Sequence, residues 1–189
     1  MAALLTIAAA ATVLQLAVDQ ASLPRDVSLP IVANEVRAIW KPLVDVVFTP
    51  EQGSCVSCGD RLELHITDAA PPAGPDPEAI GWIHFVDGRP QPTVSIAAAR
   101  VRQVLADGVW MGRPLKTLPR GAQARFLSIA VGRAVAHEIG HYIFRSPAHH
   151  PRGLMRARFT LRDFLDTDTG HFRPMPMLEA RLETGVEAP

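Results

Sequence analysis

The sequence lacks an excess of charge of either sign. Its 19 Lys and Arg residues balance 19 Asp and Glu residues, so the formal net charge at pH 7 is zero. Proteins that bind nucleic acid or anionic membranes through electrostatics carry an excess of basic residues. The sequence therefore predicts no nucleic-acid partner and no strong attraction to anionic lipid. Hydrophobic residues make up 48% of the 189 positions, which is enough for the core of a single domain.

Cysteine is scarce as well, with only Cys55 and Cys58. A structural zinc site takes about four ligands, and the chain has no second pair of cysteines. A redox pair of the thioredoxin type should open a helix, whereas these two residues fall in a turn-rich stretch at 49–60. A disulfide that closes a tight loop suits an exported chain best, so we expect Cys55 and Cys58 to be joined.

A hydrophobic run long enough for a bilayer is also missing. Residues 1–18 are almost wholly apolar, but Thr6, Thr12 and Gln15 interrupt them, and the run is short for a membrane span. A short apolar run that ends near small residues resembles a secretory signal peptide, although no Lys or Arg precedes it here. We predict that residues 1–21 are a signal peptide or else an N-terminal apolar helix. Residues 22–189 are then a single domain, secreted or periplasmic, with no stable membrane span.

The rest of the chain shows strands first and long helices later. A helix is expected over Ile31–Trp40, where apolar residues share one side and Pro42 ends the pattern. Strand-like runs follow at 43–48, 61–67, 80–86 and 93–96, with a Pro/Gly loop at 71–77. A short helix near 98–106 and a loop at 109–119 come next. A long helix then starts at Gly121 and must end by Ser146, because Pro147 disfavours helical geometry before it. Its apolar residues Leu127, Val131, Val135 and Ile139 recur at i, i+4 and predict a core-facing stripe. This order predicts an α+β domain.

The long helix carries the segment His137-Glu138-Ile139-Gly140-His141. Residues four apart on a helix lie about 40° apart around the axis and roughly 6 Å apart along it, so both imidazoles leave the same face. Neutral imidazole suits zinc, and catalytic zinc sites keep one position open for water. A carboxylate beside that water can accept its proton, which is the arrangement of helical zinc proteases. We predict that His137 and His141 bind zinc and that Glu138 is the general base.

A catalytic zinc usually has a third protein ligand. The break at Ser146-Pro147 lets the chain turn back towards the metal, which favours the next imidazoles along the chain, His149 and His150. Adjacent side chains rarely point the same way, so we expect one of them to bind the ion. His149 is our choice and His150 the alternative. The remaining histidines are a distant one, His171, and two on predicted strands, His65 and His84.

These residues resemble the metzincin clan of zinc metalloproteases, especially its matrixin-like members. The resemblance rests on the His137–His141 motif, a later His beyond a turn, and Gly153-Leu154-Met155. It implies a zincin-like α+β fold, with a small, twisted, mostly parallel sheet that has an antiparallel edge strand and packs on the active-site helix. It also implies that Met155 forms a floor beneath the metal. The edge strand in such proteins pairs with extended substrate, and residues 80–86 are the candidate.

The spacing departs from the clan pattern, in which a glycine and the third His follow at fixed positions. Phe144 stands at the position of the glycine and Pro147 at that of the third His, so His149 comes two residues late. A competing class of zincins takes a Glu from a later helix as its third ligand. Glu179 and Glu183 are the residues that could serve in that role.

The predicted function is a zinc-dependent metallopeptidase, most simply a monomeric endopeptidase that acts on peptide or protein substrates. One alternative is a catalytically silent zinc-binding domain used for protein interaction, although such a role does not require Glu138. Another is a metal-free interaction module with incidental histidines. The basic residues Arg152, Arg156 and Arg158 after the motif are either a solvated face or a preference for acidic substrate side chains.

Overall fold

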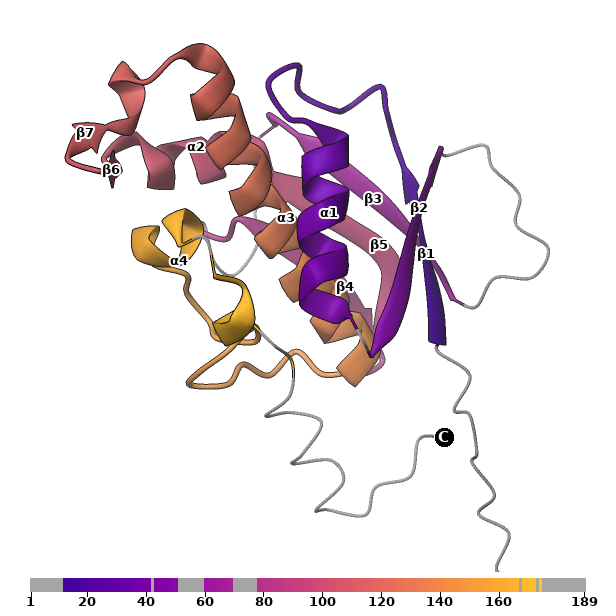
Figure 1. Ribbon diagram of the computed structural model, residues 1–189. Coiled ribbons are helices and arrows are strands. Elements are labelled where there is room, and N and C mark those ends of the chain that lie inside the picture. Colours follow the sequence, from indigo (N-terminus) through magenta and orange to yellow (C-terminus); the bar gives the residue numbers. More distant parts are fainter. Residues whose placement is uncertain are drawn as a thin grey trace, which may run out of the picture.

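The computed structural model describes residues 12–41, 43–50, 60–69, 78–166, 168–172 and 174. The predicted Cys55–Cys58 disulfide, the loop at 71–77 and the alternative ligands Glu179 and Glu183 lie outside these residues. The described elements follow in chain order (Figure 1): β1 (Thr12–Val18), α1 (Leu29–Trp40), β2 (Val44–Pro50), β3 (Arg61–Thr67), β4 (Gly81–Val86), β5 (Arg89–Ala97), α2 (Ala98–Ala106), β6 (Val109–Trp110), β7 (Arg113–Pro114), η1 (Leu115–Thr117), α3 (Arg120–Phe144), α4 (Leu161–Leu165) and η2 (Gly170–Phe172).

Five strands form one sheet in the order β2-β1-β3-β5-β4. The first four in this order pair in parallel, and β4 pairs antiparallel with β5 at the edge. Helices α1 and α3 cross the same face of the sheet side by side (Figure 1). The prediction of an α+β domain with a mostly parallel sheet, an antiparallel edge strand and a long helix is therefore confirmed, and 80–86 is that edge strand.

Part of the predicted N-terminal segment, residues 12–18, lies in the sheet. Residues 12–18 are neither a helix nor a segment separate from the domain, because they form β1 between β2 and β3. The side chains of Leu14, Leu16 and Val18 are buried in the core cluster. Cleavage near residue 21 would remove this inner strand. A strand buried on both sides is almost wholly apolar, which makes its sequence hard to distinguish from that of a leader.

Several element bounds follow the sequence closely, and β5 shows where they differ. β3 and α2 have the predicted bounds, whereas β5 begins at Arg89 instead of Thr93. Residues 89–92 include Pro90 and Pro92, which cannot donate a backbone hydrogen bond. Pairing with β3 starts only at Thr93, so among the described strands the first part of β5 pairs with β4 alone. The missing N–H groups of the two prolines are tolerated there because the side of β5 that faces away from β4 has no described strand to which it would donate hydrogen bonds.

Helix α3 is the central support of the domain. The predicted core-facing stripe, Leu127, Val131, Val135 and Ile139, is buried. From Leu127 onwards most of the other faces are buried too, against the sheet, α1, α2 and α4. The indole Nε1 of Trp40 in α1 donates a hydrogen bond of 3.2 Å to the carbonyl of Ala136. This contact fixes α1 beside the first histidine of the motif. None of the helices among the described residues is long and apolar enough to span a bilayer.

Candidate metal centre

His137 and His141 present their Nε2 atoms to one another from α3. The Nδ1 atom of His137 lies 2.7 Å from the carbonyl oxygen of Leu154, and that of His141 lies 2.7 Å from the carbonyl oxygen of Ser146. A carbonyl can only accept a hydrogen bond, so each Nδ1 must be the donor. In a neutral imidazole the other nitrogen then carries a lone pair. The two Nε2 atoms stand 3.0 Å apart.

Two lone pairs at this distance repel each other unless a cation lies between them. Two nitrogens bound to one tetrahedral zinc at about 2.0–2.1 Å stand roughly 3.3 Å apart, close to the spacing of the two Nε2 atoms. Backbone carbonyls that fix the outer nitrogen are also the usual support of metal-binding histidines. The donor set therefore fits a divalent cation that prefers nitrogen ligands.

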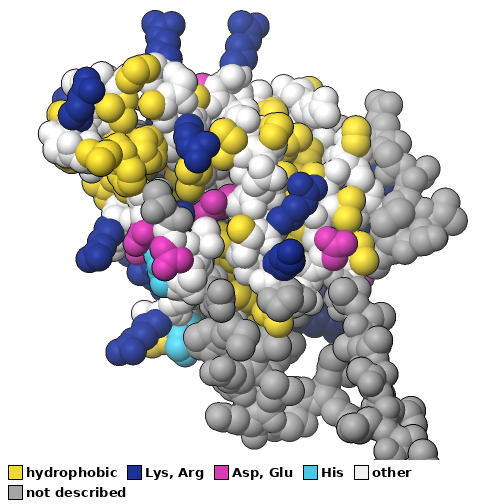
Figure 2. All heavy atoms as spheres, viewed as in Figure 1, with side chains coloured by type: hydrophobic (Ala, Val, Ile, Leu, Met, Phe, Trp, Pro, Cys, Tyr) yellow, Lys and Arg dark blue, Asp and Glu magenta, His cyan; other side chains and the backbone are white. Residues whose placement is uncertain are grey.

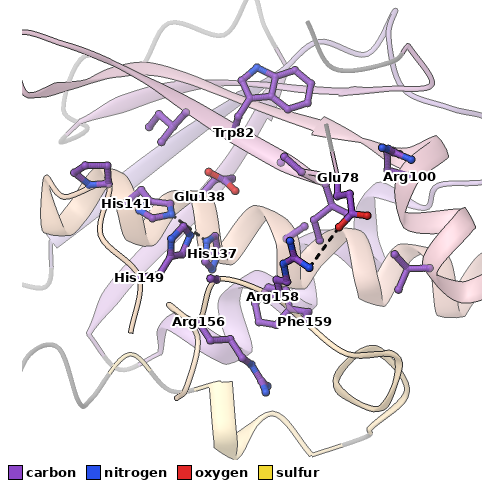
Figure 3. A pocket seen from close by; sticks show the side chains of 18 of the residues that line it. Glu78, Trp82, Arg100, His137, Glu138, His141, His149, Arg156, Arg158 and Phe159 are labelled. Atoms are coloured by element: carbon purple, nitrogen blue, oxygen red, sulfur yellow. Dashed lines mark hydrogen bonds and ion pairs between the residues drawn. The ribbon is translucent and has the colours of Figure 1, made fainter. Parts of the chain in front are cut away.

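His149 completes the cluster. Its ring centroid lies 5.3 Å from that of His137 and 4.9 Å from that of His141. One nitrogen from each of the three rings lies within 4.8 Å of the others, so the three could hold one metal ion. In Figure 3 the rings of His137, His141 and His149 converge on one point.

The other histidines lie away from this cluster. His150 turns into its own loop, where its Nδ1 lies near the backbone of Arg152. His65 faces Asp19, with 3.4 Å between Nδ1 and Oδ2, and His171 packs on Phe172 in η2. Of the two adjacent candidates, the structure thus brings His149 and not His150 to the motif.

The chain reverses at Arg145, which explains how it reaches His149 without the expected glycine. Arg145 has φ 48° and ψ 41°, the left-handed conformation that often ends a helix. Its N–H bonds to the carbonyls of His141 and Tyr142. The clan pattern has its glycine at the position of Phe144. Here the turn falls one residue later, at Arg145, and the following segment folds back along the helix. Ser146, the next residue, accepts the hydrogen bond from His141.

Met155 lies directly against the motif helix at Gly140. A Cβ added at Gly140 would stand 2.2 Å from Sδ of Met155, so only glycine allows this contact. Met155 is buried, and its carbonyl accepts a 2.7 Å hydrogen bond from the N–H of His150. This bond closes the 150–155 loop and places the carbonyl of Leu154 on His137. The close contact between Gly140 and Met155 accounts for the glycine within the motif.

Glu138 points from α3 towards the edge strand β4 (Figure 3). The residue is 5% exposed, and its carboxylate has no hydrogen-bond partner among the described residues. Burial away from water raises the pKa of this carboxyl group from 4.5 to about 8. Gly81 of β4 leaves the space that the carboxylate occupies, since a Cβ there would stand 2.9 Å from Oε1 of Glu138.

Burial acts on the histidines in the opposite direction. It lowers the pKa of His137 to about 3, and the charge of nearby His141 adds to this effect. The pKa of His141 and that of His149 are also lowered, mainly by burial. A lowered pKa keeps an imidazole neutral, which is the form that binds metal.

The four residues open into a cavity of about 640 Å³. One wall is β4 with its lead-in, and the opposite wall comes from the segment after Met155 and from α4. Phe159 from this segment packs edge-on against His137 at 5.4 Å. At the rim, Arg158 and Glu78 form an ion pair of 3.5 Å between the two walls (Figure 3). Other lining residues include Ile80, Gly81, Val104, Ala134 and Phe164.

Buried Arg133 of α3 holds the second wall in place. Its Nε donates a 2.6 Å hydrogen bond to Glu35 of α1. The same guanidinium donates to the carbonyls of Asp163 and Asp166 at α4 and stacks over the ring of Phe172 at 4.7 Å. Two of the three basic residues after the motif are paired as well: Arg158 with Glu78 at the rim, and Arg156 with Asp163 at 2.7 Å. Arg156 and Arg158 both line the cavity, but each faces an acidic partner.

Sequence reasoning missed Gly81, Phe159 and the two carbonyls that orient the histidines. Gly81 is the first residue of a strand otherwise built from larger residues, a signal for close approach of another group. The carbonyls of Ser146 and Leu154 carry no side-chain signal, since any residue could provide them.

No family model, curated protein or solved structure matches the chain. The resemblance to the metzincin clan therefore remains a prediction that rests on the motif residues, and the function must be argued from the site itself.

Proposed function

We propose that the protein is a zinc-dependent metallopeptidase and acts as an endopeptidase. The observation that carries this proposal is the position of Glu138 beside the three imidazoles, at the wall of a cavity that runs along an unpaired strand edge. The histidine cluster alone would support any metal-binding role. A buried carboxylate without a hydrogen-bond partner costs stability, and a catalytic task gives a reason to keep it at this position.

The chain's own residues would divide the work as follows. His137, His141 and His149 would hold the zinc ion, and the carbonyls of Leu154 and Ser146 keep two of the rings in the binding orientation. When bound, zinc supplies Lewis-acid chemistry, which polarises a carbonyl group and makes a water molecule acidic. Glu138 would be favoured in its ionised form by the positive charge of the bound ion, and its carboxylate would accept the proton of the attacking water and pass it to the nitrogen of the leaving amine.

Strand β4 supports a peptide as the substrate class. It is the edge of the sheet, so the backbone N–H and C=O groups on its outer side have no strand partner among the described residues. An extended peptide can pair with such an edge and is thereby held at many points along its backbone. Residues Ile80–Ile83 line the cavity beside Glu138. A peptide bound there would lie between the edge strand and the histidine cluster.

The alternative is a catalytically silent zinc-binding domain. The variant Glu138→Gln distinguishes the two functions, because glutamine keeps the size of the side chain but cannot accept a proton in the same way. For a peptidase we expect full zinc content and at least a hundredfold loss of cleavage of a mixed peptide library. The matched control is Glu63→Gln on the exposed face of β3, which should cleave normally. Zinc binding without cleavage by the wild type would favour the silent domain, and absence of zinc binding would exclude both.

A further inference from the structure

Two hairpin turns in the described part of the chain share one geometry but differ in their first residue. Asp87 and Gly88 join β4 to β5, and Met111 and Gly112 join β6 to β7. All four residues have positive φ, between 48° and 76°, as a two-residue type I′ turn requires. Asp-Gly is a preferred sequence for this turn, whereas a long apolar side chain at its first position is not. Met111 therefore has no local structural reason to be there.

Burial does not explain the apolar side chain of Met111 either. Met111 is 87% exposed and Val109 on the same hairpin is 54% exposed. Among the described residues only one other large hydrophobic residue is similarly exposed, Val86 at 54%, beside the Asp-Gly turn. Trp110 between them packs on Phe126 of α3 at 5.1 Å. The indole thus fixes the hairpin on the helix while Val109 and Met111 point into solvent.

The surroundings of this hairpin are basic. Between residues 108 and 125 the sequence has Arg113, Lys116, Arg120 and Arg125 and no acidic residue, and all four basic side chains are exposed. Arg120 is the first residue of α3, where the helix dipole already adds partial positive charge. Figure 2 shows hydrophobic side chains over the end of the molecule that carries β6 and β7, with Lys and Arg side chains projecting from the same end. This end of the molecule is therefore locally positive, although the net charge of the chain is zero.

A second cavity of about 390 Å³ opens at this end between α2, η1 and α3. Its apolar lining includes Leu105, Leu115, Phe126 and Leu127, and Lys116 and Arg120 stand among the lining residues. The one acidic residue, Asp26, is paired with Arg102 at 2.5 Å. Lys116 and Arg120 have no acidic partner in the part of the chain that the structure describes. Apolar walls beside such basic groups complement an anionic amphiphile, not a polar solute.

We propose that this end of the molecule, the docking tip formed by residues 108–125, binds the surface of a membrane that contains anionic phospholipid. Met111 and Val109 would enter the boundary between headgroups and acyl chains, and the four basic residues would face the lipid phosphates. Shallow insertion of apolar side chains combined with basic residues is the general design of interfacial anchors, and each basic residue near an anionic surface adds attraction. The first turns of α3 lie about 25 Å from the histidine motif along the helix, so docking would leave the cavity with Glu138 accessible.

The test is sedimentation of the full chain with two kinds of vesicle, one of phosphatidylcholine alone and one that also contains phosphatidylglycerol. We expect binding to the second kind, weakened by added NaCl. Met111→Asp should bind at least about tenfold more weakly, because it removes an inserted side chain and adds a negative charge. The variant recreates the Asp-Gly turn found at Asp87-Gly88, so its thermal stability should be equal or higher. The matched control, Val86→Asp, places an aspartate at another exposed apolar site, beside the Asp-Gly turn, and should bind like the wild type.

Three results would overturn the proposal: no binding to vesicles that contain phosphatidylglycerol, equal binding to both kinds of vesicle, or equal loss in Met111→Asp and Val86→Asp. Sedimentation velocity without vesicles adds a fourth. If the wild type forms dimers that Met111→Asp abolishes, the tip is an interface between two copies of the chain and not a lipid-binding surface.

Discussion

Gly81 of β4 and Glu138 of α3 approach so closely that no side chain fits between them. A Cβ at position 81 would stand 2.9 Å from Oε1 of Glu138 and 2.8 Å from Cδ1 of Ile96. The first residue of the edge strand therefore sets the position of the carboxylate that would act as the base. This contact links the sheet to the proposed chemistry and gives the first prediction.

Gly81→Ala should displace Glu138 while leaving the histidines in place. We expect zinc content to remain near that of the wild type and kcat for peptide cleavage to fall by about tenfold to a hundredfold, because a shift of about 1 Å in a catalytic group has this effect. The measurement is steady-state cleavage combined with metal analysis. Gly121→Ala is the control, since nothing lies within 4 Å of a Cβ there. If Gly81→Ala cleaves as fast as the control, the carboxylate does not depend on this contact.

Gly140→Ala should destabilise the fold through Met155. The added Cβ would overlap Sδ of Met155, and overpacking of a buried site costs about 1–3 kcal/mol of unfolding free energy. Zinc affinity should fall too, because the adjacent residue, Leu154, orients His137. Urea unfolding of Gly140→Ala, Met155→Ala and the double variant measures the coupling. We expect the double variant to lose less stability than the sum of the two single losses, by about 0.5–3 kcal/mol; strict additivity would mean that the two residues do not interact.

His149→Ala and His150→Ala should differ in metal binding. His149 belongs to the cluster, whereas His150 turns into the 150–155 loop. Loss of a supporting group around a metal already costs about 10–100-fold in affinity, so loss of a direct ligand should cost more than about a hundredfold. Competition with a chromogenic chelator measures both affinities. If His150→Ala loses the metal and His149→Ala retains it, the assignment of the third ligand is wrong.

The ion pair of Arg102 and Asp26 should make stability depend on pH in the acid range. The hydrogen bond from Arg102 lowers the pKa of Asp26 below its ordinary value of 3.8. A lowered pKa in the folded state stabilises the protein above the pKa of the unfolded state, and this contribution is lost as the pH falls through the folded pKa. Arg102 also pairs with Asp68, and all three side chains are partly exposed, so Arg102→Met should cost only about 0.5–1 kcal/mol at pH 7.

Thermal unfolding across the pH range tests the direction of this pH dependence of stability. The difference in stability between wild type and Arg102→Met should be constant from pH 7 down to about pH 5 and should shrink below that. A difference that instead grows as the pH falls would contradict the assigned role of the pair.

The sequence by itself determined the motif helix and most of the secondary structure. Apolar periodicity over Leu127–Ile139 predicted its buried stripe, and Pro147 predicted its end, because these patterns depend on local geometry that any fold must respect. The spacing of His137 and His141 likewise placed both rings on one face. The α+β class followed from the order of strands and helices, whereas the edge position of 80–86 was implied only by the resemblance to the metzincin clan.

Only the tertiary structure decided which residues complete the site. Residues 12–18 form an inner strand and not a leader-like helix, because an apolar run has the same composition in both settings and only its pairing with β2 and β3 distinguishes them. His149 instead of His150 reaches the cluster because of the left-handed turn at Arg145. The approach of Gly81 to Glu138 depends on how α3 crosses the sheet. Contacts between residues distant in sequence arise from packing, and a single sequence carries no periodic signal for them.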